Sequence, residues 1–446
     1  MASSRFKVKF GLTGLLGFVA CCAVVFWLVQ RNQPMNRVIR SLRSQNGETR
    51  ITAMHEIRAI GPAAIPALVQ ELSGGNEMGR EMAGWMLASF KSEAAPAVPA
   101  LTKALHDPKA EVRAMAAYAL SKIRSEINSA VPELTQLLKD PSALVRQHAA
   151  EALIEAGADA ESAIPALVEL VRMPCDENSD EILSRQAAGT ALTNLGPAAG
   201  PGVITLLVEE NASVQSTAVE ALARMGRDVV PHLTDAVTSD NPQTRAGAAR
   251  ALGRIGSKAD SALPALKQAM NDLDGVVRVN AAEAVFKVGR EAEPVIPVVI
   301  AGLNDQKETV VLAAIAALRD MGQDAKPSVP ILAEKLRAES KNVRRDAATA
   351  LSRIGRSAEE AVPRLIDAVQ DEDMDVRRAV VTALGRIGPG AKEAVPALNK
   401  VVQDEFNLQV RRAAASAIQE IGRDPNETPS SGGRPAGGGP RRGSGR

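Results

Sequence analysis

The sequence has few of the residues on which catalysis and metal binding usually depend. Aromatic residues make up 2% of its 446 residues, and it contains four histidines and three cysteines. The histidines stand far apart, at His55, His106, His148 and His232. No H-E-x-x-H motif, phosphate-binding Walker loop or nucleophile elbow occurs. We therefore expect a protein that is not an enzyme and that holds no metal or cofactor.

The cysteines predict no disulfide in the body of the chain. Cys21 and Cys22 lie in an apolar N-terminal segment, which leaves Cys175 alone in the remaining sequence. We expect Cys175 to be an incidental thiol in a loop.

The chain also lacks a large excess of either charge, since its formal net charge is +1. Residues 1–43 contain seven Lys or Arg and no acid, and the tail from Arg423 contains five basic and two acidic residues. The stretch between them keeps 41 basic against 50 acidic residues, a net charge of −9. A surface that binds a nucleic-acid duplex needs several Lys or Arg facing phosphates. The charge balance therefore disfavours nucleic acid as a partner.

What the sequence has in abundance is a helical pattern, which is clear in residues 98–123. Pro99 suits the first position of a helix, because its missing N–H would have no partner there. Asp107 and Pro108 are typical of a helix end and a turn. A second helix then places its apolar residues within about 100° of arc, the width of a core stripe. These residues are Val112, Ala116, Ala119, Leu120 and Ile123. We call the first helix of such a pair the A helix and the second the B helix.

The pattern recurs with a period close to 33 residues. The equivalent prolines are Pro66, Pro99, Pro132, Pro165, Pro201, Pro231, Pro264, Pro297, Pro330, Pro363 and Pro396. A marker residue in the B helix follows most of them by fourteen positions: Arg80, Arg113, Arg146, Gln215, Arg245, Arg278, Val311, Arg344 and Arg377, with Arg185 and Arg411 at other intervals. A degenerate unit around Asn36 and Arg50 precedes these, which makes about twelve helix pairs. A period of this length is typical of arrays whose units bury their apolar faces by stacking.

The repeat has the signature A-x-P-x-L, then D-(P), then V-R-x-x-A-A-x-A-L-x-x-I-G. It is seen at residues 361–388 as AVPRLIDAVQDEDMDVRRAVVTALGRIG. This signature resembles the HEAT family of repeats and, more narrowly, the short HEAT-like repeats also found in phycobilisome lyases. The resemblance covers roughly residues 36–422. It implies an all-α fold, an α-solenoid whose B helices line the concave side, and a role as a binding surface.

Residues 10–29, FGLTGLLGFVACCAVVFWLV, are twenty consecutive residues without a charge. As a helix they would span about 30 Å, the thickness of the hydrocarbon core of a bilayer. A cleaved signal peptide and a lipoprotein signal with its cysteine at Cys21 are alternatives. We predict an uncleaved transmembrane anchor in a single-pass membrane protein of bacterial origin. Positive charges are equal on its two sides, and the short basic N-tail favours an array outside the cytoplasm.

Composition divides the chain into five parts. They are a basic N-tail (1–9), the transmembrane anchor (10–29), a short linker (30–35), the repeat solenoid (36–422) and a Gly/Pro/Arg tail (423–446). The tail cannot bury apolar surface and is expected to be disordered. One repeat has an acidic insertion at residues 173–181, which we expect to be a solvated loop.

Candidate contact residues lie on the side of the B helices opposite the core stripe. Counted from the marker as zero, position +5 carries His55, Trp85 and Tyr118 in consecutive repeats. Trp and Tyr are favoured anchors of interfaces, although scattered exposed rings are the other interpretation. Position +9 carries a basic stripe of Arg224, Arg254, Lys287, Arg353 and Arg386. This stripe could receive an acidic peptide or another anionic polymer, or it could be an ordinary solvated face.

A set of acidic residues stands six positions before the markers, at Asp107, Asp140, Asp272, Asp305 and Asp371. They are close enough to cap the B helix or to pair with an Arg of the same or a neighbouring repeat. The HEAT resemblance implies a ladder of such Asp–Arg pairs. Gln215 and Val311 interrupt the ladder, and we expect softer joints there.

These observations predict a membrane-anchored scaffold that binds protein partners through its concave B-helix face. The narrower resemblance leaves open a lyase-like enzyme, or an enzyme subunit, of the type that acts on bilins. A nucleic-acid binder is a less favoured alternative.

Overall fold

The computed structural model describes residues 35–174 and 179–423. Within these residues α-helices alternate with short 3₁₀ turns, and there is no strand. The chain divides into two compact units, Met1–His232 and Leu233–Arg446, which we call unit 1 and unit 2. The predicted all-α fold is confirmed for the described residues.

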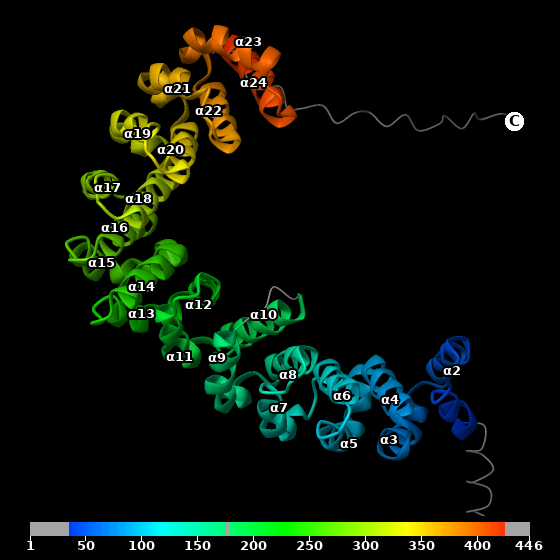
Figure 1. The fold of residues 1–446 in the computed structure, drawn as a ribbon. Coiled ribbons are helices and arrows are strands. Elements are labelled where there is room, and N and C mark those ends of the chain that lie inside the picture. The colour runs from blue at the N-terminus through cyan, green and yellow to red at the C-terminus, as the bar shows by residue number, and fades with distance from the viewer. Residues whose placement is uncertain (1–34, 175–178, 424–446) are drawn as a thin grey trace, which may run out of the picture. The chain divides into compact units, whose positions relative to one another are not determined.

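Unit 1 is a row of helix pairs, each with a short A helix and a longer B helix (Figure 1). Its A helices are residues 35–41, α3 (Ile65–Gly74), α5 (Val98–Ala104), α7 (Val131–Leu137), α9 (Ile164–Arg172) and α11 (Gly200–Ile204). Its B helices are α2 (Gly47–Ile60), α4 (Glu77–Ser89), α6 (Ala110–Ile123), α8 (Ala143–Ala156), α10 (Ser179–Asn194) and α12 (Ala212–Met225).

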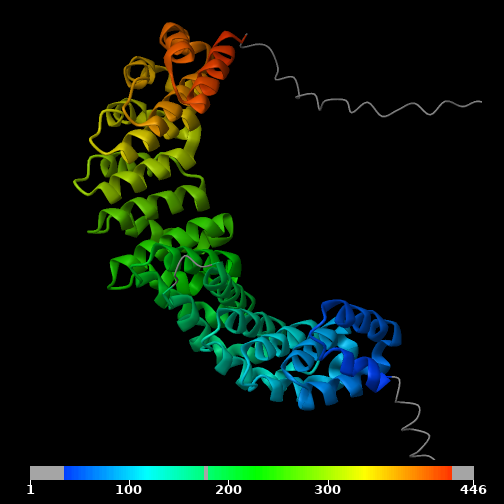
Figure 2. The same ribbon diagram turned by 45° about the vertical axis from the view of Figure 1, so that its right-hand side comes forward.

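Unit 2 repeats the same arrangement, and its helices lie stacked in chain order from green to red in Figure 2. The A helices are α13 (Val230–Ala236), in which the division between the units falls, α15 (Leu263–Ala269), α17 (Ile296–Leu303), α19 (Val329–Lys335), α21 (Val362–Ala368) and α23 (Val395–Asp404). The B helices are α14 (Pro242–Ile255), α16 (Gly275–Gly289), α18 (Glu308–Met321), α20 (Lys341–Ile354), α22 (Met374–Ile387) and α24 (Leu408–Gly422).

Local chemistry sets where the helices begin and end. The repeat proline lies in the first turn of most A helices, as Pro99 does in α5, where a missing N–H costs no hydrogen bond. Many B helices begin after a capping Asn or Asp, and in α14 the Asn241 side chain accepts the N–H groups of Gln243 and Thr244 at 2.8 and 3.1 Å. Several B helices end at a glycine with positive φ, such as Gly355 at 67°, a conformation that side chains disfavour. Where the sequence predicted Asp272 and Asp371 as caps, the capping side chains belong to Asp274 and Asp373, two residues further along the chain.

The core consists of small and aliphatic side chains. The predicted stripe of α6 is buried, since Val112, Ala116 and Leu120 are each 0% exposed. Consecutive B helices approach closely where a glycine faces an alanine: a Cβ added to Gly253 would lie 3.2 Å from the Cα of Ala284. Such close approach leaves little room for aromatic side chains, which explains their scarcity in the sequence.

The predicted single-pass membrane localisation is corrected by one finding. Among the residues that the structure describes, no helix is long and apolar enough to cross a membrane. The longest of the described helices, α10, has 16 residues, whereas a span needs about 20 predominantly apolar ones. The N-tail, the predicted anchor at 10–29 and the tail from residue 424 lie outside the described residues, as does Cys175.

Candidate functional site

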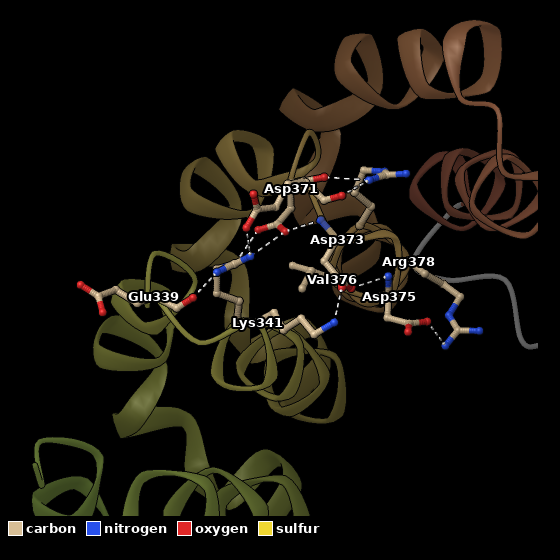
Figure 3. Close-up of polar contacts among 10 residues, drawn as sticks. Glu339, Lys341, Asp371, Asp373, Asp375, Val376 and Arg378 are labelled. Carbon is tan, nitrogen blue, oxygen red and sulfur yellow. Dashed lines mark hydrogen bonds and ion pairs between the residues drawn. The ribbon is translucent and has the colours of Figure 1, made fainter. Parts of the chain in front are cut away.

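A ladder of arginine–carboxylate pairs fixes each repeat against the next and so positions the B helices. In one rung, the Nε and Nη2 atoms of Arg344 donate to the two carboxylate oxygens of Asp371 at 2.7 and 3.1 Å. Its Nη1 donates to the carbonyls of Ala338 and Glu339 at 2.9 and 2.8 Å. Asp371 also accepts the N–H of Asp373 at 2.9 Å (Figure 3). One guanidinium therefore joins the turn of its own repeat to the turn of the next.

Equivalent rungs recur in both units. They are Arg80–Asp107, Arg113–Asp140, Arg245–Asp272, Arg278–Asp305 and Arg377–Glu405. Hydrogen bonds from Arg245 and Arg377 hold the pKa of Asp272 and that of Glu405 below their usual values. The predicted ladder is confirmed, and the acid partner belongs to the following repeat.

The insertion at residues 173–181 takes part in the same ladder. Nη2 of Arg146 donates to the Glu181 carboxylate at 2.6 Å. Glu181 lies in the first turn of α10, which begins at Ser179. Its placement in a solvated loop was therefore wrong, because an acid three residues into a helix can reach the preceding repeat.

At Gln215 and Val311 the marker arginine itself is missing, and at Arg50 and Arg185 the guanidinium has no carboxylate partner among the described residues. Gln215 keeps one contact of the pattern, from its Nε2 to the carbonyl of Glu209 at 2.8 Å. Val311 has no guanidinium, and Ala338 replaces the acid that would face it. A hollow of about 560 Å³ lined by Val311 and Ala338 opens at that place. The predicted interruptions are confirmed, whereas their softness stays a prediction.

In unit 1 the predicted ring-bearing residues lie on neighbouring B helices. Tyr118 on α6 contacts His148 on α8, with 5.2 Å between ring centroids. The Lys122 ammonium lies 4.9 Å from the Tyr118 ring, and the Arg58 guanidinium lies 5.0 Å from the Trp85 ring on α4. Cations over aromatic faces are favourable contacts. Both rings are half-buried, so each presents a rigid, partly open surface.

Two other predicted residues of unit 1 lie apart from these rings. His55 is exposed on α2 and makes none of the ring contacts found among the described residues. Arg224 on α12 forms an ion pair with Glu220 at 2.8 Å. It lines a hollow of about 430 Å³ with hydroxyl-bearing residues such as Thr190 and Ser213.

In unit 2 the structure brings three of the four predicted cations into one groove of about 620 Å³. We call it the basic groove. Its charged lining consists of Arg254, Lys287, Arg290, Arg319, Asp320 and Arg353. These residues lie at the C-terminal ends of α14, α16, α18 and α20. Arg386 is exposed on α22 and is not part of the lining.

Sequence reasoning missed several of these neighbours. His148 was set aside as an isolated histidine, although it stands at position +2 of the repeat that follows Tyr118. Arg290 takes a left-handed φ of 59° after α16, because α16 continues through Gly289, where the equivalent glycines of other repeats end the helix. Arg319 occupies position +8 and not the +9 position that defined the stripe. A search that allowed one residue of register difference would have found it.

The described residues contain no group of three or more His, Cys, Asp or Glu side chains placed to hold a metal ion. Near Tyr118, burial would raise the pKa of Glu151, but hydrogen bonds from His148 and Gln147 outweigh it and hold that pKa below its usual value. The clusters on the B helices consist of rings, cations and carboxylates.

The comparisons with known proteins agree with this architecture. The family model for HEAT repeats matches residues 65–129, 98–179, 200–285 and 329–419. Because these matches cover more than half of the sequence, the chain belongs to the HEAT-repeat family. The family model does not test the narrower likeness to phycobilisome lyases. Among curated proteins, none matches the chain.

Solved structures of a karyopherin share the fold. The crystal structure of Kap121p matches with a TM-score of 0.59 at 15% identity, over 87% of this chain and 49% of that one. Kap121p bound to the SUMO protease Ulp1p gives 0.60 at 15% identity, over 85% and 48%. Kap121p bound to Nup53p gives 0.60 at 15% identity, over 87% and 49%. The chain thus spans about half the length of these structures, and identities this low show the fold alone.

Proposed function

We propose that the chain is a protein-interaction scaffold that binds its partner through the exposed side of its B helices. The observation that carries this proposal is the set of partly open rings on α4 and α6. Trp85 and Tyr118 stand at the same position of consecutive repeats, and each is braced by a cation. Rings that are held rigid lose little entropy on binding, and Trp and Tyr are frequent anchors of interfaces.

We further propose that the B-helix side of each unit is its concave side. Contacts between consecutive B helices are in most repeats more extensive than those between consecutive A helices. We place the layer with the more extensive contacts on the inside of the curve, because a concave surface surrounds more of a partner than a flat one. The Kap121p structures with Ulp1p and Nup53p, which share the fold, contain protein partners, and this supports the same class of partner here.

The contact residues of this proposal come from both units. They are His55, Trp85, Tyr118 and Arg224 in unit 1, and Arg254, Lys287, Arg353 and Arg386 in unit 2. All lie on B helices within the array predicted for residues 36–422. The lyase-like and nucleic-acid alternatives stay predictions that no observation on the described residues favours.

The test is affinity purification of the tagged chain from cells that naturally express it, followed by mass spectrometry. We expect the Trp85→Ala/Tyr118→Ala variant to lose most of the protein that co-purifies with the wild type, because two anchors are removed. Phe406→Ala is the matched control, since Phe406 is 99% exposed in a turn between α23 and α24 and belongs to no B helix. Equal recovery of partners by both variants would show that the rings are not the contact surface.

A further inference from the structure

The basic groove of unit 2 collects positive charge that the rest of the unit does not neutralise. Three of its cations, Arg254, Arg290 and Arg353, are exposed and have no ion pair among the described residues. Other exposed cations of unit 2, such as Arg250 and Lys326, also lack an ion pair among the described residues, so what distinguishes the groove is that its unpaired cations line one hollow. Lys and Arg balance Asp and Glu over residues 233–422, so the excess in the groove is local.

The acid in the lining is already shared by two cations. Asp320 lies 2.7 Å from the Lys287 ammonium and 3.3 Å from the Arg319 guanidinium. Lys287 also forms a pair with Glu283. Burial would raise the pKa of Asp320, but these hydrogen bonds and charges outweigh it and hold the pKa below its usual value. Asp320 is therefore ionised, and its negative charge is shared by Lys287 and Arg319. The charges of Arg254, Arg290 and Arg353 have no carboxylate partner among the described residues.

Cations at the C-terminal ends of helices also stabilise the helix dipole, and that role must be separated from binding. The dipole effect needs a cation near each helix end, and it does not need a hollow between the cations. Here Gly256 and Gly322 line the groove, and a Cβ added to them would lie 4.0 and 3.8 Å from the nearest atom, so their missing side chains leave it open. The buried Phe286 forms an apolar part of the wall, with the Arg290 guanidinium 5.8 Å from its ring. The site is thus a cavity with cations at its rim.

We propose that the basic groove binds an acidic, carboxylate-rich segment of a protein partner. This inference rests on the proposed scaffold function and assigns a chemical class to one contact. Four of the five cations are Arg, whose planar guanidinium can pair with both oxygens of a carboxylate. Side chains that converge from four helix ends fit a short extended peptide, which presents its carboxylates at intervals of a few ångströms.

The same charges fit a nucleic acid less well. A nucleic-acid strand needs a track of phosphate contacts longer than one groove. The basic stripe is interrupted inside the groove by Asp320, and Glu283 pairs with Lys287 beside it. A phosphate chain laid along the stripe would meet both acids.

The experiment measures fluorescence anisotropy of a labelled oligo-glutamate peptide with the purified full-length chain at low salt. Oligo-glutamine and oligo-thymidylate of the same length are the competing probes. The test variant is Arg254→Glu/Arg353→Glu, in which both substituted residues are exposed and unpaired. The matched control is Lys258→Glu/Arg356→Glu, which reverses two exposed cations in the turns after the same two helices and outside the groove.

We expect the wild type to bind oligo-glutamate and not oligo-glutamine. The test variant should bind at least about tenfold more weakly, because two close charge pairs become repulsive. The control variant should change the affinity by less than about twofold, since its charges lie outside the groove. Arg254→Gln/Arg353→Gln, which adds no repulsion, should fall between the wild type and the charge reversal.

Three results would overturn the inference: no binding of oligo-glutamate, equal losses in the test and control variants, or tighter binding of oligo-thymidylate than of oligo-glutamate. None of them bears on the rings of unit 1. A failure here therefore remains distinguishable from a failure of the scaffold function, which the Trp85→Ala/Tyr118→Ala variant tests. Circular dichroism of each variant shows whether a loss of binding comes from a loss of fold.

Discussion

At the scale of residues, the most constrained groups are the arginines and acids of the ladder. In most rungs the guanidinium donates to one or two carbonyls of its own repeat and to a carboxylate of the next, as Arg344 does with Asp371. Both of these side chains are 9% exposed. A guanidinium that is this deeply buried is stable because the carboxylate and the carbonyls accept its hydrogen bonds and the carboxylate neutralises its charge. Removing one partner should therefore lower the free energy of unfolding by more than the intact pair contributes to it.

We predict that Asp371→Ala lowers the free energy of local unfolding at the start of α22 by about 2 kcal/mol, because the buried Arg344 guanidinium then keeps only the exposed Glu372 carboxylate, 3.2 Å from its Nη2. Hydrogen exchange of the amides of residues 373–377 measures this. Asp367→Ala is the control: its pair with Arg337 is 59% exposed on both sides and should cost under about 0.5 kcal/mol. Similar losses in both variants would contradict the role assigned to the rung.

At the scale of elements, the ladder shows which joints between repeats differ. Most B helices of unit 2 are tied to the next turn, but α18 is not, since Val311 and Ala338 replace the two partners and a hollow lies between them. Val311 is 7% exposed, so an isolated charge would be poorly solvated there. The joint can be repaired only if both residues change together.

We predict that Val311→Arg/Ala338→Asp stabilises the start of α20 by about 1 kcal/mol, the size of a charge-assisted hydrogen-bonded contact. Val311→Arg alone should destabilise it, because the new guanidinium has no carboxylate to meet. A double-mutant cycle on amide protection in α20 measures the coupling. Additive effects of the two single changes would show that the hollow cannot hold a rung.

At the scale of the whole molecule, stability is a sum over neighbouring repeats. Unit 1 and unit 2 each bury their own aliphatic core. Within unit 1 the ladder is weak near α10, where Arg185 contacts the Ser213 hydroxyl at 3.3 Å and the carbonyl of Met173 in place of an acid. Arrays with unequal joints lose the all-or-none unfolding of small domains.

We predict that urea unfolds the chain in more than one transition. Trp85 reports on unit 1, and in a Trp27→Phe background it is the single tryptophan. Its fluorescence midpoint should therefore differ from the midpoint of far-ultraviolet circular dichroism, which follows all the helices. Coincident midpoints would mean that the two units unfold together.

The repeat, the helix pairs, the buried stripe and the ladder could be predicted from the sequence, because they depend on local periodicity and on contacts between adjacent repeats at a fixed spacing. Proline, asparagine and glycine mark the helix ends in many of the repeats, so the position of Arg344 or Asp371 follows from counting residues along the sequence. Which exposed residues share a surface follows from how the helices pack in space. Arg254 and Arg353 share position +9, but Arg290 and Arg319 stand at other positions of their repeats, and the four line one groove because the ends of their helices converge. That convergence depends on how the helices stack, which a linear count of positions does not contain.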